Sequence, residues 1–300
     1  MGVVRDGRSC LFGWGQASTT RWKERAGLIY GGSRLNDFDL ICREFRGGHD
    51  ITIIPIADVH LGAKECREDT FRRFVQSVKD TPNVFVILGG DLINNSTRSS
   101  IGSPFNEVPP HIQKREMTKI LEPIADRILC AVSGNHERRS KKDADDDATY
   151  DILCKIDREA VYREDIAFLK LQLGEQNTSG GSRSNAELRP TYSIVVTHGS
   201  GGGYLPGAAV NRGQRYGYIF DGMDLLVLAH THVPNISKYR KIKIDTRNNK
   251  ITTDDFKVVI STSWLEYSGY PVQKMLYPAS FAEQSIILSG RGKRITVQTT

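Results

Sequence analysis

Five apolar segments of this 300-residue chain each run directly into Asp, Asn or His, the side chains that bind metal ions and move protons. Short apolar runs rich in β-branched residues predict buried strands. In open α/β sheets, ligands bind beyond the carboxyl ends of the strands. We therefore expect the polar residues to meet at one edge of a sheet. After the runs ITIIPIA, NVFVILGG, ILCAVSG, YSIVVT and LLVLA, these residues are Asp58 and His60, Asp91, Asn135 and His136, His198, and His230 and His232.

The order of expected elements indicates the fold class. Strands alternate with helices up to about residue 165, with helices expected around residues 71–78, 109–127 and 148–159, and mainly strands follow. This pattern predicts an α/β fold in which two sheets pack together with helices outside. We expect an irregular N-terminal extension over residues 1–36 and a single domain over 37–300.

Two segments have a more specific interpretation. FDLICREF and ITIIPIADVH flank a Gly-Gly-His-Asp turn, which predicts a β-hairpin. The Gly/Ser/Asn-rich stretch 174–189 is typical of a loop.

Composition narrows the setting of the protein. Nothing approaches a spanning apolar stretch, so we expect no membrane partner. The five cysteines are scattered without a C-x-x-C pair, which indicates free thiols and a cytoplasmic location. The net charge of +6 is compatible with an anionic substrate or nucleic acid but indicates neither.

The spacing of the polar residues favours a pair of metal ions. Alternate residues of a strand face the same way, so His230 and His232 would each hold one ion of a pair about 3.5–4 Å apart. Asp91 could bridge both ions. Nitrogen and oxygen donors without thiolate favour Mn²⁺, with Fe, Zn²⁺ or Ni²⁺ as alternatives. Taken singly, Asp58 and Asp91 could instead be helix N-caps, and the histidines turn or core residues, but this requires a coincidence at all five strand ends.

The ordered series D-x-H (58–60), G-D (90–91), G-N-H-E (134–137), H-G (198–199) and H-x-H (230–232) resembles the calcineurin-like metallophosphoesterase superfamily. The resemblance implies a four-layer αββα sandwich and hydrolysis of phosphate esters by a hydroxide shared by two ions. His136 would contact the phosphate and assist the leaving group. Ala229 stands where the family usually has glycine. The resemblance assigns one ion to Asp58, His60, Asp91 and His232, and the other to Asp91, Asn135, His198 and His230.

The motifs look closer to the nuclease and phosphodiesterase branches than to the protein serine/threonine phosphatases. In those phosphatases the second motif continues as G-D-x-V-D-R-G, whereas this chain has GDLINNS, without the arginine. The expected substrate is therefore a phosphodiester, with a DNA nuclease as the alternative. A non-catalytic scaffold, like a retromer subunit of this superfamily, is the third reading, although such scaffolds lose ligands and this chain has every ligand type.

Basic residues near the motifs have two readings each. Arg138 and Arg139, with the lysines after them, either bind substrate phosphate or pair with the acidic run DADDD. Arg212 and Arg215 are weaker candidates for binding substrate phosphate at the rim of the site. The basic segment KYRKIKI either follows a nucleic-acid backbone or, as we favour, protects a sheet edge.

Overall fold

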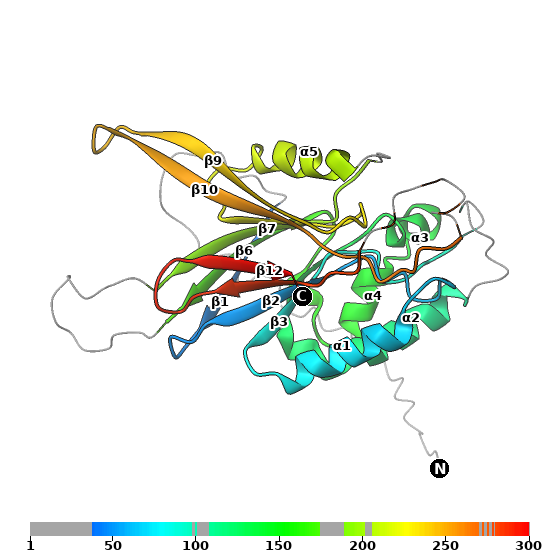
Figure 1. Ribbon diagram of the computed structural model, residues 1–300. Helices are drawn as coiled ribbons and strands as arrows, with labels where there is room; N and C mark the ends of the chain where they lie inside the picture. The colour runs from blue at the N-terminus through cyan, green and yellow to red at the C-terminus, as the bar shows by residue number, and fades with distance from the viewer. Residues whose placement is uncertain are drawn as a thin grey trace, which may run out of the picture. The chain divides into compact units, whose positions relative to one another are not determined.

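Two six-stranded β-sheets lie face to face in the computed structural model (Figure 1). The structure describes residues 38–97, 100, 108–174, 189–201, 206–269, 272, 275, 278 and 280–299. The expectations for residues 1–36 and for most of the loop at 174–189 lie outside this part of the chain.

Sheet A contains strands from both halves of the sequence. Its pairings are mixed: β1–β6, β7–β8 and β8–β10 are parallel, whereas β6–β7 and β10–β9 are antiparallel. In spatial order its strands are β1 (Leu40–Phe45), β6 (Ile166–Leu173), β7 (Thr191–Thr197), β8 (Leu225–Leu228), β10 (Lys250–Ile260) and β9 (Asn235–Asp245).

Sheet B holds the first three motif strands in parallel, so their carboxyl ends reach the same edge. In spatial order its strands are β12 (Ile295–Thr299), β11 (Gln284–Leu288), β2 (Ile51–Ile56), β3 (Val84–Leu88), β4 (Ile128–Val132) and β5 (Tyr162–Arg163).

The helices cover the outer faces of both sheets (Figure 1). α1 packs on sheet B through Phe71, Phe74, Val75 and Val78, the residues whose spacing predicts it. α5 (Pro206–Gly217) covers sheet A. The helices near sheet B are α1 (Glu68–Asp80), α2 (Pro110–Leu121), α3 (Glu137–Ala144) and α4 (Ala148–Cys154). A 3₁₀ helix (Glu122–Arg127) follows α2, and a second, short one (Glu159–Val161) follows α4.

Three apolar clusters fill the spaces between these layers. One lies between sheet B and its helices and includes Met117 and Trp264. The second lies between the two sheets and includes Tyr192, and the third lies between sheet A and α5. The expected four-layer αββα sandwich is therefore confirmed.

The predicted hairpin of residues 38–60 is wrong. β1 pairs in parallel with β6 of sheet A, whereas β2 pairs with β3 and β11 of sheet B. The turn therefore carries the chain from one sheet to the other. Gly47 and Gly48 both have positive φ, a backbone that glycine adopts without strain.

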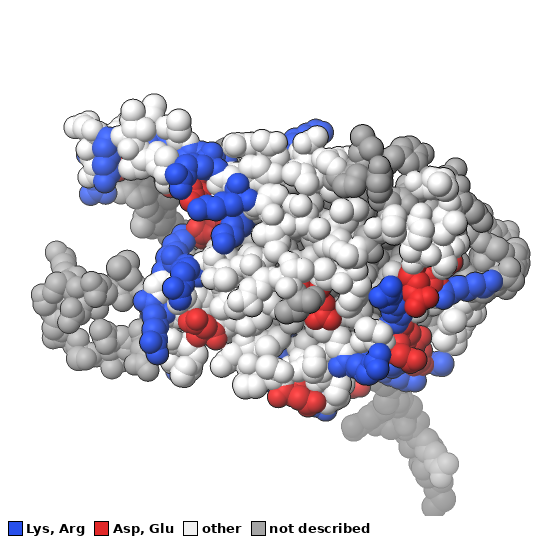
Figure 2. Space-filling model, viewed as in Figure 1, with Lys and Arg blue, Asp and Glu red and all other residues white. Residues whose placement is uncertain are grey.

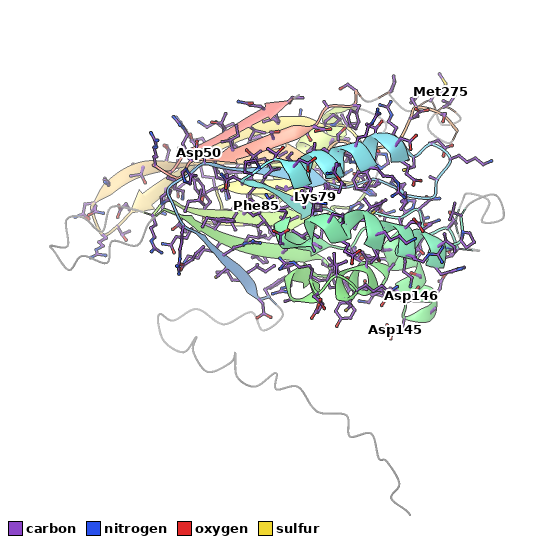
Figure 3. All side chains as sticks on the ribbon, turned by 90° about the horizontal axis from the view of Figure 1, so that it is seen from below. Asp50, Lys79, Phe85, Asp145, Asp146 and Met275 are labelled. Carbon is purple, nitrogen blue, oxygen red and sulfur yellow. The ribbon has the colours of Figure 1, made fainter. Side chains whose placement is uncertain are left out.

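Two helices were not predicted from the sequence. α3 and α5 occupy segments for which the sequence pattern predicts no helix. Asp146 lies just past the end of α3 (Figure 3), and its carboxylate accepts a 2.7 Å hydrogen bond from Lys114 of α2.

The remaining expectations concern surface and thiols. His49 and His111, the two histidines outside the motifs, are exposed. KYRKIKI forms part of the edge strand β9, as predicted. The four described cysteines are free thiols, also as predicted. Within the described residues, none of the helices has the length and apolarity needed to cross a membrane.

Candidate metal centre

The motif residues lie in loops just past the strand ends, where the backbone turns into the left-handed region. β2, β3 and β8 end at residues 56, 88 and 228, before the motif residues begin. This corrects the expectation that His230 and His232 share one face of a strand. Left-handed backbone is unusual for residues other than glycine and clusters at functional sites. The values of φ are +51° for Asp58, +49° for His60, +51° for Asp91, +72° for His230 and +56° for His232.

One group of donors contains Asp58, His60 and His232. Asp58 Oδ1 lies 3.3 Å from His232 Nε2 and 4.0 Å from His60 Nε2. The two imidazole nitrogens are themselves 3.4 Å apart. These three side chains can all reach one metal ion.

A second group contains Asp91, His198 and His230, which also have the spacing for one ion. His198 Nε2 lies 3.4 Å from Asp91 Oδ2. Asn135 Oδ1 joins this group, at 3.0 Å from His198 Nε2 and 2.7 Å from His230 Nδ1.

Asp91 lies between the two groups. Its Oδ2 atom is 3.7 Å from His60 Nε2, in the first group, as well as 3.4 Å from His198 Nε2, in the second. The structure therefore brings all seven residues expected as metal ligands to one edge of the sandwich. His60, Asp91 and His136 form a third group with the spacing for one ion, so His136 lies within reach of the same donors.

The chemistry of these atoms fits divalent cations. Asp58 Oδ1 is buried, and within the described residues it makes no contact that meets hydrogen-bond geometry; His232 Nε2, at 3.3 Å, pairs with it electrostatically. A buried carboxylate oxygen with so little hydrogen bonding suits a cation. His198 Nδ1 donates to the carbonyl of Gly89 at 2.8 Å, which makes Nε2, facing Asp91 and Asn135, the ring nitrogen that can bind a cation. The donors are nitrogen and oxygen without sulfur, a set that suits Mn²⁺, Fe, Zn²⁺ and Ni²⁺.

The electrostatics point the same way. Burial disfavours charge on Asp91, but the surrounding histidines, His198 foremost, hold the pKa of Asp91 well below its usual range. Burial opposes the charged form of His198 too, but Asp91 raises the pKa of His198 to about 9, so a metal ion that binds here displaces the His198 proton. Burial lowers the pKa of His60, so that its imidazole is neutral. A buried carboxylate beside neutral imidazole is a favourable environment for a cation.

The two sheets are joined at this edge by hydrogen bonds between motifs. The His230 N–H, after a strand of sheet A, donates to Asp58 Oδ2, after a strand of sheet B, at 2.9 Å. The bond from His198 to Gly89 crosses in the same way. The candidate site therefore lies at the seam of the sandwich.

His136 lies beside the two groups, with its backbone fixed by the ligand loop. Its N–H donates to Asp91 Oδ1 at 2.8 Å. Its Nδ1 atom donates to the carbonyl of Asn94 at 2.7 Å. The Nε2 atom, 3.9 Å from Asp91 Oδ2, is therefore the ring nitrogen available for chemistry.

The two arginines after His136 point in different directions. Arg139 Nη2 lies 3.0 Å from His136 Nε2, and its Nη1 lies 3.4 Å from Ser100 Oγ. Arg138 instead pairs with Asp165 at 2.9 Å. Arg139 thus reaches the site by contact with His136, whereas Arg138 is paired elsewhere.

The other basic candidates lie farther along the chain. Arg212 and Arg215 belong to α5, and Arg215 is exposed. Arg212 lies against Gly201, and its buried Nη1 makes no hydrogen bond within the described part of the chain. Lys141 pairs with Asp147 at 3.1 Å, so the acidic run does neutralise part of the basic cluster.

The sequence interpretation missed two residues that shape the site. Glu137 is fully buried, and its carboxylate accepts hydrogen bonds from four backbone N–H groups, two of them those of Asp91 and Gly134. Burial and the nearby Asp91 raise the pKa of Glu137 to about 7, although the four donors favour the ionised form. Its place in G-N-H-E was the available signal.

Asn95 is the second missed residue. It is fully buried with φ +44°, and its Nδ2 donates to the His136 carbonyl at 2.8 Å and to Ser140 Oγ at 2.9 Å. Gln113 of α2 accepts a bond from the Asn95 N–H at 2.8 Å. The signal in the sequence was an adjacent pair of asparagines after the G-D motif.

Two glycines are required by close approach at the same place. A Cβ atom on Gly134 would lie 2.1 Å from Asp91 Oδ1, and one on Gly90 would lie 2.5 Å from the backbone nitrogen of Gly134. Ala229, by contrast, is not among the residues with positive φ, so a methyl group causes no backbone strain there.

Comparison with known proteins identifies the family to which the chain belongs. The model of the family described as calcineurin-like phosphoesterase matches residues 51–234, more than half of the chain, and the protein belongs to this family. None of the curated proteins compared with it matches the sequence.

Several solved structures are similar over most of the chain, at low identity. The calcineurin-like phosphoesterase YfkN from Bacillus subtilis is 11% identical, with 84% of this chain and 91% of that chain covered and a TM-score of 0.34. Vps29 from Chaetomium thermophilum is 9% identical, with 83% and 95% covered and a TM-score of 0.36. The NAD nucleotidase NadN from Haemophilus influenzae is 10% identical, with 84% and 49% covered and a TM-score of 0.31.

Proposed function

We propose that this calcineurin-like phosphoesterase hydrolyses phosphodiesters with two divalent cations, Mn²⁺ foremost. Two groups of buried nitrogen and oxygen donors, with the Asp91 carboxylate between them, carry the proposal. Asp58, His60, Asp91 and His232 would hold one ion, and Asp91, Asn135, His198 and His230 the other. Bound cations would lower the pKa of water and screen the phosphate charge.

In this proposal His136 protonates the departing oxygen through Nε2. Its Nδ1 proton is committed to the Asn94 carbonyl, and Nε2 accepts a hydrogen bond from the Arg139 guanidinium in this structure. Nε2 would carry the transferred proton once that guanidinium turns to the substrate phosphate. Burial lowers the pKa of His136, and Arg139 lowers it further. A substrate phosphate beside the ring would favour the protonated form, because an anion stabilises imidazolium.

Arg139 is the arginine that we assign to the substrate. It contacts His136 Nε2, where the phosphate and leaving group would lie, and a guanidinium can bind two phosphate oxygens at once. Arg138 pairs with Asp165, so it is a poorer candidate. Arg212 and Arg215 remain weaker candidates for the rim.

The preference for diesters rests on the second motif. Asn95 occupies the position where protein serine/threonine phosphatases have the arginine of G-D-x-V-D-R-G, and here its side chain braces His136 from the interior. Without an arginine at that place, the site has less positive charge to neutralise its substrate. A diester, which carries one negative charge, therefore fits better than a monoester dianion. A DNA nuclease is the alternative substrate class. The free thiols support our placement in the cytoplasm.

The decisive experiment is an activity panel with Mn²⁺, Fe²⁺, Zn²⁺ and Ni²⁺. The substrates are bis(p-nitrophenyl) phosphate, p-nitrophenyl phosphate, cyclic nucleotides and labelled DNA. We expect turnover of the bis ester. Turnover of the monoester alone would overturn the diester preference, and turnover of DNA alone would favour the nuclease.

Variants separate metal binding from proton transfer. We expect Asp91→Asn to lose bound metal and activity together, and His136→Ala to retain both ions and lose turnover. His111→Ala, at an exposed position on α2, is the matched control and should behave like the wild type. A folded wild-type protein that shows no turnover with any metal would favour a scaffold.

A further inference from the structure

The β9–β10 hairpin carries an exposed apolar group at its far end. Ile242, Ile244 and Ile251 are 78%, 74% and 76% exposed. Ile251 lies directly opposite Ile244 in the antiparallel register, and Ile242 follows on the same side of the pleat as Ile244. The three side chains therefore form one apolar cluster on one face, which we call the isoleucine cluster.

The same hairpin is strongly basic. Residues 235–260 contain seven Lys or Arg and three Asp, a net charge of +4 out of the +6 of the whole chain. Figure 2 shows Lys and Arg side chains gathered over this end of the molecule and few over the middle of the same face.

The cations differ in how far they are neutralised. Lys238 and Arg240 share the single carboxylate of Asp255. Arg247 and Lys250, at the turn, are exposed and form no ion pair with any described residue. Asp245, opposite Lys250 in the register, is the one carboxylate of the tip. Residues 242–251 thus carry Lys243, Arg247 and Lys250 against Asp245, and a net charge of +2 lies next to the isoleucine cluster.

We propose that the tip of this hairpin, residues 242–251, is a peripheral docking site for an anionic lipid bilayer. Isoleucine side chains can enter the boundary between headgroups and acyl chains, while lysine and arginine bind the lipid phosphates. A bilayer satisfies both parts of the surface at once. The proposal replaces the sequence-based expectation of no membrane partner, which concerned spanning segments.

Other occupants fit the surface less well. Nucleic acid would use the cations, but single strands stack on aromatic residues and residues 242–251 contain none. A second copy would place one +4 hairpin against another. Three isoleucines are also a small apolar area beside the roughly 800 Å² per partner that a standard protein interface buries.

The geometry separates this surface from the metal centre. β9 begins at Asn235, three residues after His232, and runs for 11 residues. At about 3.4 Å per residue its far end lies about 35 Å from its start. A bilayer bound at the tip therefore leaves the metal centre open to soluble substrates.

The test is sedimentation of the full chain with phosphatidylcholine vesicles, with and without phosphatidylserine. We expect binding that needs phosphatidylserine and weakens with salt. The triple variant Ile242→Thr, Ile244→Thr, Ile251→Thr should lower vesicle affinity at least tenfold, because threonine retains the strand propensity and removes the apolar surface. Ile219→Thr, at a position that is 61% exposed outside the hairpin, is the matched control and should bind like the wild type.

A second variant, Arg247→Gln with Lys250→Gln, should also lose at least tenfold in affinity for phosphatidylserine vesicles. Both hairpin variants should hydrolyse a soluble diester like the wild type, so a failure of the proposed reaction and a failure of the docking site give different results. Equal vesicle binding by the wild type and the triple variant, or no binding by either, would overturn the proposal. So would DNA binding that the charge variant loses and the triple variant keeps, or a dimer that the triple variant abolishes.

Discussion

Asn95→Ala is expected to destabilise the protein and to disturb His136 at the same time. Asn95 has left-handed backbone and holds the His136 carbonyl and Ser140 Oγ through its amide nitrogen. Alanine would have to adopt the same φ of +44° without either hydrogen bond.

The magnitude follows from these contacts. Left-handed backbone costs alanine about 1 kcal/mol more than asparagine, which tolerates it. Each of these two short hydrogen bonds contributes about 1 kcal/mol net. The third bond from Asn95 Nδ2, to the Glu137 carbonyl at 3.4 Å, is too long to add much. Both acceptors keep another partner, since the Arg139 N–H donates to the His136 carbonyl and Ser140 Oγ donates to Asp146. The expected loss in the free energy of unfolding is therefore about 3 kcal/mol.

Asn83→Ala is a matched control for the backbone contribution. Asn83 is exposed, with φ +58°, and its carbonyl retains the hydrogen bond from Thr52 after the substitution. It should lose about 1 kcal/mol. The difference between the two variants, about 2 kcal/mol, measures the side-chain hydrogen bonds of Asn95.

The assay is urea unfolding of metal-free protein, followed by circular dichroism. A loss below about 0.5 kcal/mol for Asn95→Ala, or equal losses for both variants, would refute the reasoning. In metal-loaded protein, we expect turnover of the bis ester to fall about tenfold to a hundredfold in Asn95→Ala, because a small displacement of His136 is enough for such a loss. Asn83→Ala should leave turnover unchanged.

Three further predictions concern a charge, the thiols and the metals. Burial alone would lower the pKa of Lys114, but its bonds to Asp146 and Asp151 raise it. The two ion pairs therefore stabilise the fold fully below the unfolded-state pKa of Lys114, and this contribution is lost as pH rises through the folded-state pKa. In urea unfolding, Lys114→Met should therefore lose more free energy of unfolding, relative to the wild type, at pH 8 than at pH 11. An equal loss at both pH values would contradict this. Burial raises the pKa of Cys66 to about 12, so a thiol reagent followed by peptide mass spectrometry should label exposed Cys42 well before it. Removing metals with a chelator should lower Tm, measured by calorimetry, by about 5–10 °C, the stabilisation expected from ligands present at about 100 times their Kd. An unchanged Tm would argue against bound metal.

The sequence was most informative where apolar strands end in polar residues. Because parallel strands align their carboxyl ends, residues as distant as Asp58 and His232 can be assigned to one place from the order of the strands alone. The left-handed turns that orient these side chains could not be predicted, because Asp and His, although enriched in left-handed backbone, adopt it at only a minority of their positions. The strand-face argument for His230 and His232 was wrong for this reason.

The missed elements have separate physical causes. α5 contains Gly213 and Gly217, which lower helix propensity but let the helix lie close to β10. A Cβ atom on Gly217 would lie 2.2 Å from the Phe256 ring. α3 is short and highly charged, so it has little apolar periodicity to detect. The pairing of β1 with β6 depends on contacts more than 100 residues apart, which no local pattern encodes.

The seam between the sheets also affects how the protein is made. Each donor group is divided in chain order: Asp58 and Asp91 precede His198, His230 and His232, and the bond from His230 to Asp58 spans 172 residues. At 5–20 residues per second, a ribosome needs roughly 10 to 30 s to synthesise that interval. Through this time the nascent chain carries only part of each donor group, so neither ion can be held by its full set. Stable metal uptake is therefore delayed until the second sheet has emerged and docked on the first.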